Sequence, residues 1–185
     1  MADVVVPVAF AVKGGEHAAN LWRYKSPRAG SDAAPSAAAL RALLLVFLRD
    51  HRACVCRAVG VAGFTHVAVV PTARGRPGPH PLRTLISPCV RIPWAELVAR
   101  PGEPGRELNP ARFAAAPVPG AHILLLDDTW TTGASAQSAA MALRRAGAAA
   151  VATVVLGRHV AAAGSLAAAA APFCQDSCAV HDRDR

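Results

Sequence analysis

The sequence predicts an α/β protein in which helices flank a central, mainly parallel sheet. Three short apolar runs, at residues 65–70, 123–126 and 151–156, are continuous rather than alternating, which is typical of parallel strands covered on both faces. A helical pattern between the second and third runs supplies the crossover that joins parallel strands. The chain shows no internal repeat, so we expect a single domain over residues 1–185.

The first third of the chain predicts a strand, a long helix and a second strand. Residues 4–12 form an apolar run typical of a strand. A helix is expected to begin near Ser31 or Asp32, because both residue types are good N-caps. The strand at 65–70 follows this helix. The stripe that faces the helix towards the core consists of Leu40, Leu43, Leu44, Phe47 and Leu48.

The middle of the chain predicts a long connection and then a strand–helix–strand unit. Residues 72–119 are rich in Pro, Gly and Arg, with a short helix expected over 93–100. Residues 101–105 are expected to form an exposed loop, and a connection this long is typical of a functional lid. The helix that follows the strand at 123–126 is expected over 135–146 and to be closed by Gly147.

Composition and charge narrow the function classes. Hydrophobic residues make up 53% of the chain, but no uninterrupted apolar stretch is long enough for a membrane span, and the N-terminus lacks a signal-peptide pattern. We therefore expect a cytoplasmic protein without a membrane partner. The net charge is +8, yet the basic residues are dispersed without an aromatic stripe. This distribution favours an anionic small substrate over nucleic acid.

The most informative stretch is residues 123–135, in which four apolar residues are followed by two acids and a Thr-Thr-Gly-Ala-Ser turn. Gly133 permits a backbone in which N–H groups converge on an anion, and the following helix directs its positive end to the same place. Asp127 and Asp128 would repel a bare phosphate, so they need vicinal ribose hydroxyls or a divalent cation as partners. The alternative is an ordinary strand–turn–helix whose acids only cap the helix.

This stretch resembles the phosphoribosyl pyrophosphate signature of type I phosphoribosyltransferases. The resemblance implies transfer of 5-phosphoribosyl from phosphoribosyl pyrophosphate to a small nitrogenous acceptor, with release of pyrophosphate and with Mg²⁺ as cofactor. It implies that Asp127 and Asp128 contact the ribose hydroxyls. The residues implied to hold the 5′-phosphate are Thr131, Thr132, Gly133, Ala134 and Ser135.

Two further segments resemble the ComF-like branch of this family. Residues 106–113 are similar to its element with Arg106, Asn109 and Phe113, and residues 67–76 lie where it has a pyrophosphate loop. The zinc ribbon often found at the front of that branch is missing, which argues against a role in DNA uptake. The residues implied to bind pyrophosphate are Thr72, Ala73, Arg74 and Gly75, and those implied to be catalytic are Arg74, Arg76, Asp127 and Asp128.

The resemblance also implies a lid and a small variable hood over the acceptor. The hood is expected from residues 1–33 and the C-terminal tail, while Arg100 and Arg106 are lid candidates. Further arginines that are candidates for the lid are Arg83 and Arg91. Residues of the hood that are candidates for acceptor binding are Trp22, Tyr24 and Lys25, which could equally pack against the first helix.

Two smaller patterns carry weaker expectations. His80 is a candidate general base, although an isolated histidine in a loop is more often a surface residue. The spacing in the tail would suit a structural zinc ion, whereas buried free cysteines are the alternative. The candidate zinc ligands are Cys174, Cys178 and His181, with Cys54 or Cys56 as a fourth and His51 as a further partner.

Two other functions fit the same residues. The protein could be a regulatory module that binds phosphoribosyl pyrophosphate or a nucleotide without turnover, or a ComF-like protein associated with DNA uptake. Release of pyrophosphate would separate the enzyme from the regulatory module, and salt-dependent binding of single-stranded DNA would indicate the third function. The family resemblance also implies a homodimer.

Overall fold

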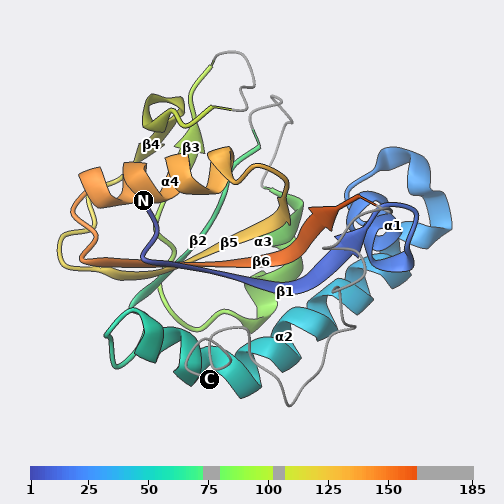
Figure 1. Cartoon of the computed structure of the whole chain (residues 1–185), viewed down its shortest axis with the longest axis horizontal. Coiled ribbons are helices and arrows are strands. Elements are labelled where there is room, and N and C mark those ends of the chain that lie inside the picture. The colour runs from blue at the N-terminus through green and yellow to red at the C-terminus, as the bar shows by residue number, and fades with distance from the viewer. Residues whose placement is uncertain (73–79, 102–106, 162–185) are drawn as a thin grey trace.

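The computed structural model describes residues 1–72, 80–101 and 107–161, and it contains a parallel sheet with helices on both faces (Figure 1). Every neighbouring pair of strands in this sheet is parallel. The prediction of an α/β fold with a central parallel sheet flanked by helices is therefore confirmed. The order across the sheet is β1 (Val4–Val12), β6 (Ala150–Val160), β5 (His122–Trp130) and β2 (His66–Val69).

The two faces of the sheet bury different helices. On one face Leu124 and Leu126 of β5 pack in the cluster that includes Leu40 and Phe47 of the long helix α2 (Ala33–Ala58). On the other face, alternate β5 residues pack against the alanine-rich α4 (Ala134–Arg145) and against a small antiparallel sheet. Alternation along a strand produces this division. The small sheet consists of β3 (Leu97–Ala99) and β4 (Phe113–Ala115).

The N-terminal elements lie at two different places. β1 pairs only with β6 in the described sheet and so forms its edge, with Val4 opposite Ala152. The next elements, α1 (Glu16–Arg23) and η1 (Pro27–Asp32), follow the carboxyl end of β1 (Figure 1). Of the residues expected in the hood, those of β1 therefore belong to the main sheet. The tail lies outside the described residues.

The long helix begins at Ala33, directly after the expected N-cap at Asp32. Within the described residues, Arg28–Ala58 is the one segment long and apolar enough to cross a membrane by length and composition, with a hydropathy of 1.4. In this fold α2 packs its buried stripe, including Leu44, against the sheet and α1. This is the pattern of an amphipathic helix with one buried stripe, and 22% of the apolar window is buried.

The prediction of a short helix over residues 93–100 is wrong. Around Trp94 the chain runs parallel to β2, where Val67 donates its N–H to the Pro93 carbonyl and accepts one from Ala95. These backbone bonds hold the segment extended, and it continues into β3. The short helices lie earlier, as α3 (Pro81–Ile86) and η2 (Ser87–Cys89), and η3 (Pro110–Arg112) precedes β4.

The strand predicted at 123–126 is longer than expected. β5 continues beyond its apolar core because Thr129 and Trp130 pair with Gly157 and Arg158 of β6. The two acids therefore lie inside a hydrogen-bonded strand rather than in the turn that follows it. Their side chains must alternate between the two faces of the sheet, like those of their neighbours.

Candidate functional site

The candidate site lies at the carboxyl edge of the parallel sheet. β5 ends there at Trp130, β2 is followed there by Pro71 and Thr72, and α4 begins there (Figure 1). α1 and η1 lie at the same edge, next to the end of β6. Open α/β sheets bind ligands at this edge, because loops and helix N-termini converge on it.

Asp128 is the charged centre of this edge. Its Oδ2 accepts hydrogen bonds from the Tyr24 hydroxyl and from Lys25 Nζ, the latter at 2.8 Å, and its side chain is only 8% exposed. Burial acts to raise the pKa of Asp128, but the Lys25 ammonium, the two hydrogen bonds and the nearby His80 together lower it. Asp128 is therefore an ionised carboxylate whose counter-ion comes from a residue that precedes it by 103 positions.

Asp127 has the opposite character. It shares the strand parity of Ile123 and Leu125, which pack towards α4. Burial, together with the charge of Asp128, raises the pKa of Asp127 to about 8. Near neutral pH, Asp127 is therefore largely protonated, so the sequence motif of two acids becomes one carboxylate and one neutral carboxyl group.

This difference predicts how stability depends on pH. Folded Asp127 keeps a proton that the unfolded chain releases near pH 4, so raising the pH from 4 to about 8 favours the unfolded chain. We expect the free energy of unfolding to fall by up to about 1.4 kcal/mol per pH unit from this group. The slope should disappear in Asp127→Asn, measured by urea unfolding.

The pH dependence of urea unfolding reports most directly on Asp127 between pH 6.5 and 8. Burial lowers the pKa of His17, so that histidine contributes an opposite slope, which ends near its unfolded pKa of about 6.5. Because the pKa of Asp128 is lowered, this group changes the free energy of unfolding only at acid pH, outside the measured range. A wild-type slope that persists unchanged in Asp127→Asn would show that this carboxyl is ionised in the folded protein.

The turn after β5 leads through a left-handed glycine into α4. Gly133 is the N-cap of α4 and has a φ of +79°, and as a glycine it supplies no side chain to cap the helix. The Thr132 hydroxyl accepts a long hydrogen bond of 3.4 Å from the Ala134 N–H. The threonine hydroxyls are exposed and Ser135 is partly exposed. The first turn of α4 thus offers amides and hydroxyls at its positive end.

Trp130 shapes this turn and was not identified from the sequence. A Cβ on Gly133 would lie 2.0 Å from Cζ2 of the Trp130 ring, so the indole packs directly on the glycine. Only glycine therefore fits, both for its backbone angle and for this contact. A large aromatic residue directly before the Thr-Thr-Gly sequence was the signal available, but sequence alone does not show which way the ring turns.

The other predicted residues of the reaction centre are placed only in part. Thr72 follows β2 at the same edge, whereas Ala73, Arg74, Gly75 and Arg76 lie outside the described residues. His80 is the N-cap of α3, where its Nδ1 accepts a hydrogen bond of 3.1 Å from the Leu82 N–H. The charge of His80 also acts on Asp128, which places this histidine in electrostatic reach of the site.

The predicted lid arginines are dispersed. Arg83 forms a bidentate ion pair with Glu96, at 2.8 and 3.1 Å, and stacks on Trp94. Arg91 donates to the Pro88 carbonyl. Arg100 lines a pocket beside α4, and Arg106 lies outside the described residues. The first two arginines are thus engaged in local contacts away from Asp128.

Of the hood candidates, Tyr24 and Lys25 are the ones brought to the acid pair. Trp22 is 54% exposed and lies on the outer side of α1. The sequence marked all three residues together and could not show which of them turn inward. The contact with Asp128 joins segments far apart in the chain, so local patterning carried no signal for it.

The expected zinc ligands in the tail, Cys174, Cys178 and His181, lie outside the described residues. Of their proposed partners, Cys56 and His51 are buried and Cys54 is partly buried, all on α2. Burial raises the pKa of the Cys56 thiol. The part of the chain that can be described contains no group of three or more metal-binding side chains.

The ion pair at Asp128 leads to a stability prediction. Lys25→Met should lower the free energy of unfolding by about 2 kcal/mol, because it leaves a buried carboxylate without its cation. Lys13→Met is the matched control, since Lys13 is exposed and its replacement should change stability by less than about 0.5 kcal/mol. In an Asp128→Asn background the cost of Lys25→Met should vanish in urea unfolding. An equal cost in that background would refute the pairing.

Comparison with known proteins finds no matching protein-family model and no matching curated protein. Among solved structures, the chain is similar to orotate phosphoribosyltransferase of Mycobacterium tuberculosis H37Rv in complex with inorganic phosphate. The two chains are 21% identical with a TM-score of 0.42, and the match covers 74% of this chain and 75% of that one.

Two further solved structures are similar at the same level. The same M. tuberculosis enzyme in complex with 5-phospho-α-D-ribosyl 1-diphosphate is 22% identical, with a TM-score of 0.43 and coverage of 79% of this chain and 86% of that one. A phosphoribosyltransferase from Corynebacterium diphtheriae is 22% identical, with a TM-score of 0.39 and coverage of 72% and 83%. The function proposed next rests on the residues of this chain itself.

Proposed function

We propose that this protein binds phosphoribosyl pyrophosphate at the carboxyl edge of its sheet and transfers the 5-phosphoribosyl group to a small nitrogenous acceptor. One observation carries the proposal. A hydroxyl-rich turn at the N-terminus of α4 directly follows a strand that presents a buried, ionised carboxylate. The first feature suits a phosphate ester and the second suits sugar hydroxyls, so together they suit a sugar phosphate.

The 5′-phosphate is assigned to the turn. The exposed residues Thr131 and Thr132 and the partly exposed Ser135 adjoin the first amides of α4, whose dipole favours a dianion. Gly133 holds the turn in the left-handed conformation that directs successive N–H groups to one point. Binding here would fix one end of the substrate.

The ribose is assigned to Asp128. An ionised carboxylate accepts hydrogen bonds from vicinal hydroxyls, and Lys25 and Tyr24 hold it in place on the face that carries α1. The role implied for Asp127 changes, because a neutral carboxyl on the other face is a poor partner for a cation. Asp127 is proposed to position the strand end beneath the turn.

The reaction breaks the bond between the anomeric carbon and the pyrophosphate oxygen, and the acceptor nitrogen forms the new bond. The electron pair leaves with pyrophosphate, so cationic side chains near that group would stabilise the transition state. Arg74 and Arg76, next to Thr72 in the sequence, remain the proposed residues for this role. The ionised Asp128 would stabilise positive charge that develops on the ribose.

The carboxyl edge offers Mg²⁺ one suitable protein ligand. Asp128 supplies a hard carboxylate oxygen, and because the described residues offer no cluster of three ligands, the remaining ligands would be substrate oxygens and water. When bound, the ion would neutralise charge on the departing diphosphate. Asp128 is thus the proposed protein ligand.

The acceptor site is proposed to lie between His80 and the end of α1, because Tyr24 and Lys25 directly after α1 bind Asp128 and the charge of His80 acts on it. The Nδ1 atom of His80 already accepts the Leu82 N–H, so the proton of a neutral ring lies on Nε2, and the general-base role expected for His80 would require the bond to Leu82 to break. Membership of the ComF-like branch, a cytoplasmic location, dimerisation and a zinc site in the tail remain proposals from the sequence.

The test combines binding and turnover. Calorimetry with phosphoribosyl pyrophosphate and Mg²⁺ should show a single site, and a coupled assay should detect pyrophosphate release with at least one member of a panel of nucleobases and amines. Binding without release across the panel would favour the regulatory module. Failure to bind either phosphoribosyl pyrophosphate or ribose 5-phosphate would overturn the proposal.

A further inference from the structure

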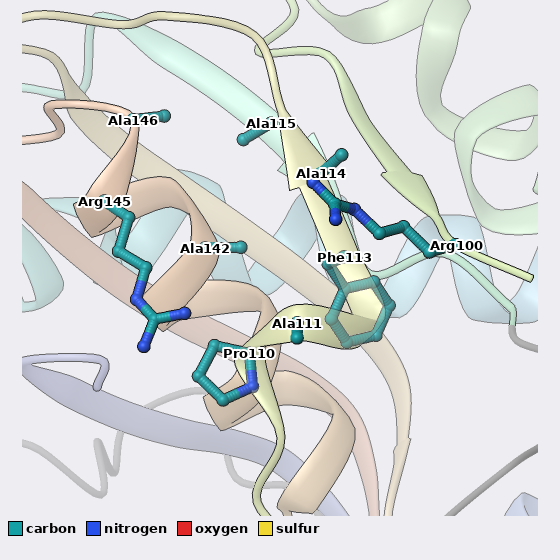
Figure 2. A pocket seen from close by; sticks show the side chains of 9 residues that line it. All are labelled: Arg100, Pro110, Ala111, Phe113, Ala114, Ala115, Ala142, Arg145 and Ala146. Carbon is teal, nitrogen blue, oxygen red and sulfur yellow. The ribbon is translucent and has the colours of Figure 1, made fainter. Parts of the chain in front are cut away.

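A second concave site lies beside the C-terminal half of α4. It is a cavity of 290 Å³ between this helix, η3 with β4, and the residue that follows β3 (Figure 2). The volume is close to the lower end of the range for small-molecule sites. Its position is set by the packing of the small sheet on α4, and it is separate from the loops at the carboxyl edge.

Two arginines give this cavity its charge. Figure 2 shows Arg145 on the helix side and Arg100 on the strand side, with its guanidinium in front of Ala114. No ion pair joins either guanidinium to a carboxylate among the described residues. Both arginines are exposed, and an anion bound in the cavity would be attracted by both charges.

A structural role for Arg145 at the helix end is already filled by its neighbour. Arg144 donates to the Ala148 and Ala149 carbonyls and to Asp3, and thereby ties the end of α4 to β6 and the N-terminus. Arg145 makes none of these contacts in the described chain, and its side chain extends along the helix towards Pro110 (Figure 2). Its charge is therefore available to a ligand.

The rest of the wall is apolar. Pro110, Ala111 and Ala114 give the cavity its accessible apolar surface, and Phe113 and Ala142 lie buried behind it. A bare inorganic ion would leave this surface wet, whereas an anion with a compact flat apolar part would cover it. The lining thus combines two positive charges with an apolar floor.

This cavity is distinct from the proposed phosphoribosyl site. Along α4, which rises about 1.5 Å per residue, Ala142 and Arg145 lie about 12 and 16 Å from Ala134 at the phosphate turn. α4 runs from the carboxyl edge of the sheet towards the opposite edge (Figure 1). One small ligand cannot occupy both places.

We propose that this cavity is a binding site for a small organic dianion, such as an aryl phosphate or an aromatic dicarboxylate. Its charges meet Arg100 and Arg145, and its ring packs on Pro110, Ala111 and Ala114. The alternative is that both arginines are solvated surface charges that bind no ligand. The cavity shares no residue with the turn at 131–135 or with Asp128, and the inference makes no use of the lid role predicted for Arg100, so it does not depend on the function proposed above.

The experiment is a titration of the full chain, labelled with ¹³C in the alanine methyl groups, with phenyl phosphate. Ala114 and Ala142 report on this cavity, while Ala134 reports on the phosphate turn. We expect the first two methyl signals to shift. The double variant Arg100→Gln/Arg145→Gln should weaken this binding at least about tenfold, as the loss of charge-assisted hydrogen bonds implies.

Arg41→Gln is the matched control, because Arg41 is an exposed arginine of α2. It should leave the titration unchanged, and thermal unfolding should show that all variants fold. Shifts confined to Ala134, an absence of shifts, or wild-type affinity in the double variant would each overturn the proposal. If the signals at the cavity and at Ala134 both shift in the wild-type chain and only those at the cavity are lost in the double variant, the result would support two independent sites.

Discussion

Asp128→Asn should weaken the binding of phosphoribosyl pyrophosphate with Mg²⁺ by about ten- to a hundredfold and leave the fold intact. The loss follows because charge-assisted hydrogen bonds are worth about 1.5–3 kcal/mol, and the amide cannot replace the carboxylate towards ribose hydroxyls. Stability should change little, since asparagine keeps the shape and the Lys25 side chain is one-third exposed to water, at 34%. Calorimetry and urea unfolding measure the two effects separately.

Two matched variants sharpen this result. Asp50→Asn changes a surface carboxylate that pairs with Arg49, so it should leave the affinity unchanged. Asp127→Asn should weaken binding less than Asp128→Asn near neutral pH, because Asp127 carries little charge there. Wild-type affinity in Asp128→Asn, or a larger loss in Asp127→Asn, would contradict the assignment of the ribose to Asp128.

Gly133→Ala should lower the free energy of unfolding by about 2–5 kcal/mol and abolish detectable binding of ribose 5-phosphate. The left-handed backbone costs about 1–2 kcal/mol for alanine, and displacing the Trp130 ring, which lies 2.0 Å from the new Cβ, adds a cost of overpacking of about 1–3 kcal/mol. Both effects distort the turn that presents the amides of α4. Urea unfolding and calorimetry are the measurements.

Gly60→Ala separates the two costs. Gly60 has a φ of +71°, and no described atom lies within 4 Å of the place that an alanine Cβ would take, so only the backbone cost applies there. We expect a loss of about 1–2 kcal/mol in that control. Trp130→Ala should recover part of the loss in Gly133→Ala. Equal losses at the two glycines would show that the indole does not restrain the turn.

The sequence predicted the elements that are dictated locally. Continuous apolar runs identified β2, β5 and β6, and the stripe from Leu40 to Leu48 identified α2, because burial imposes these patterns directly. The features that the sequence did not predict depend on pairing between strands. β5 runs on to Trp130 because β6 accompanies it, and residues near Trp94 are extended because β2 binds their backbone.

The residues of the candidate site also fall into those that local sequence predicts and those that only the fold brings together. The turn and its glycine follow from adjacent residues, so sequence placed them correctly at the start of α4. The different environments of Asp127 and Asp128 were not predictable from their adjacency, since strand geometry turns them to opposite faces. Lys25 reaches Asp128 only through the fold, and no local pattern encodes that contact.

The position of β1 has a consequence for biosynthesis. Its described strand partner is β6, about 148 residues later in the chain, so a growing polypeptide emerges from the ribosome with its first strand unpaired. Closing so long a loop is slow, and an exposed apolar strand invites association with other nascent chains. Because Tyr24 and Lys25 follow this strand directly after α1, their contact with Asp128 depends on the pairing of β1 with β6, which requires translation past Val160.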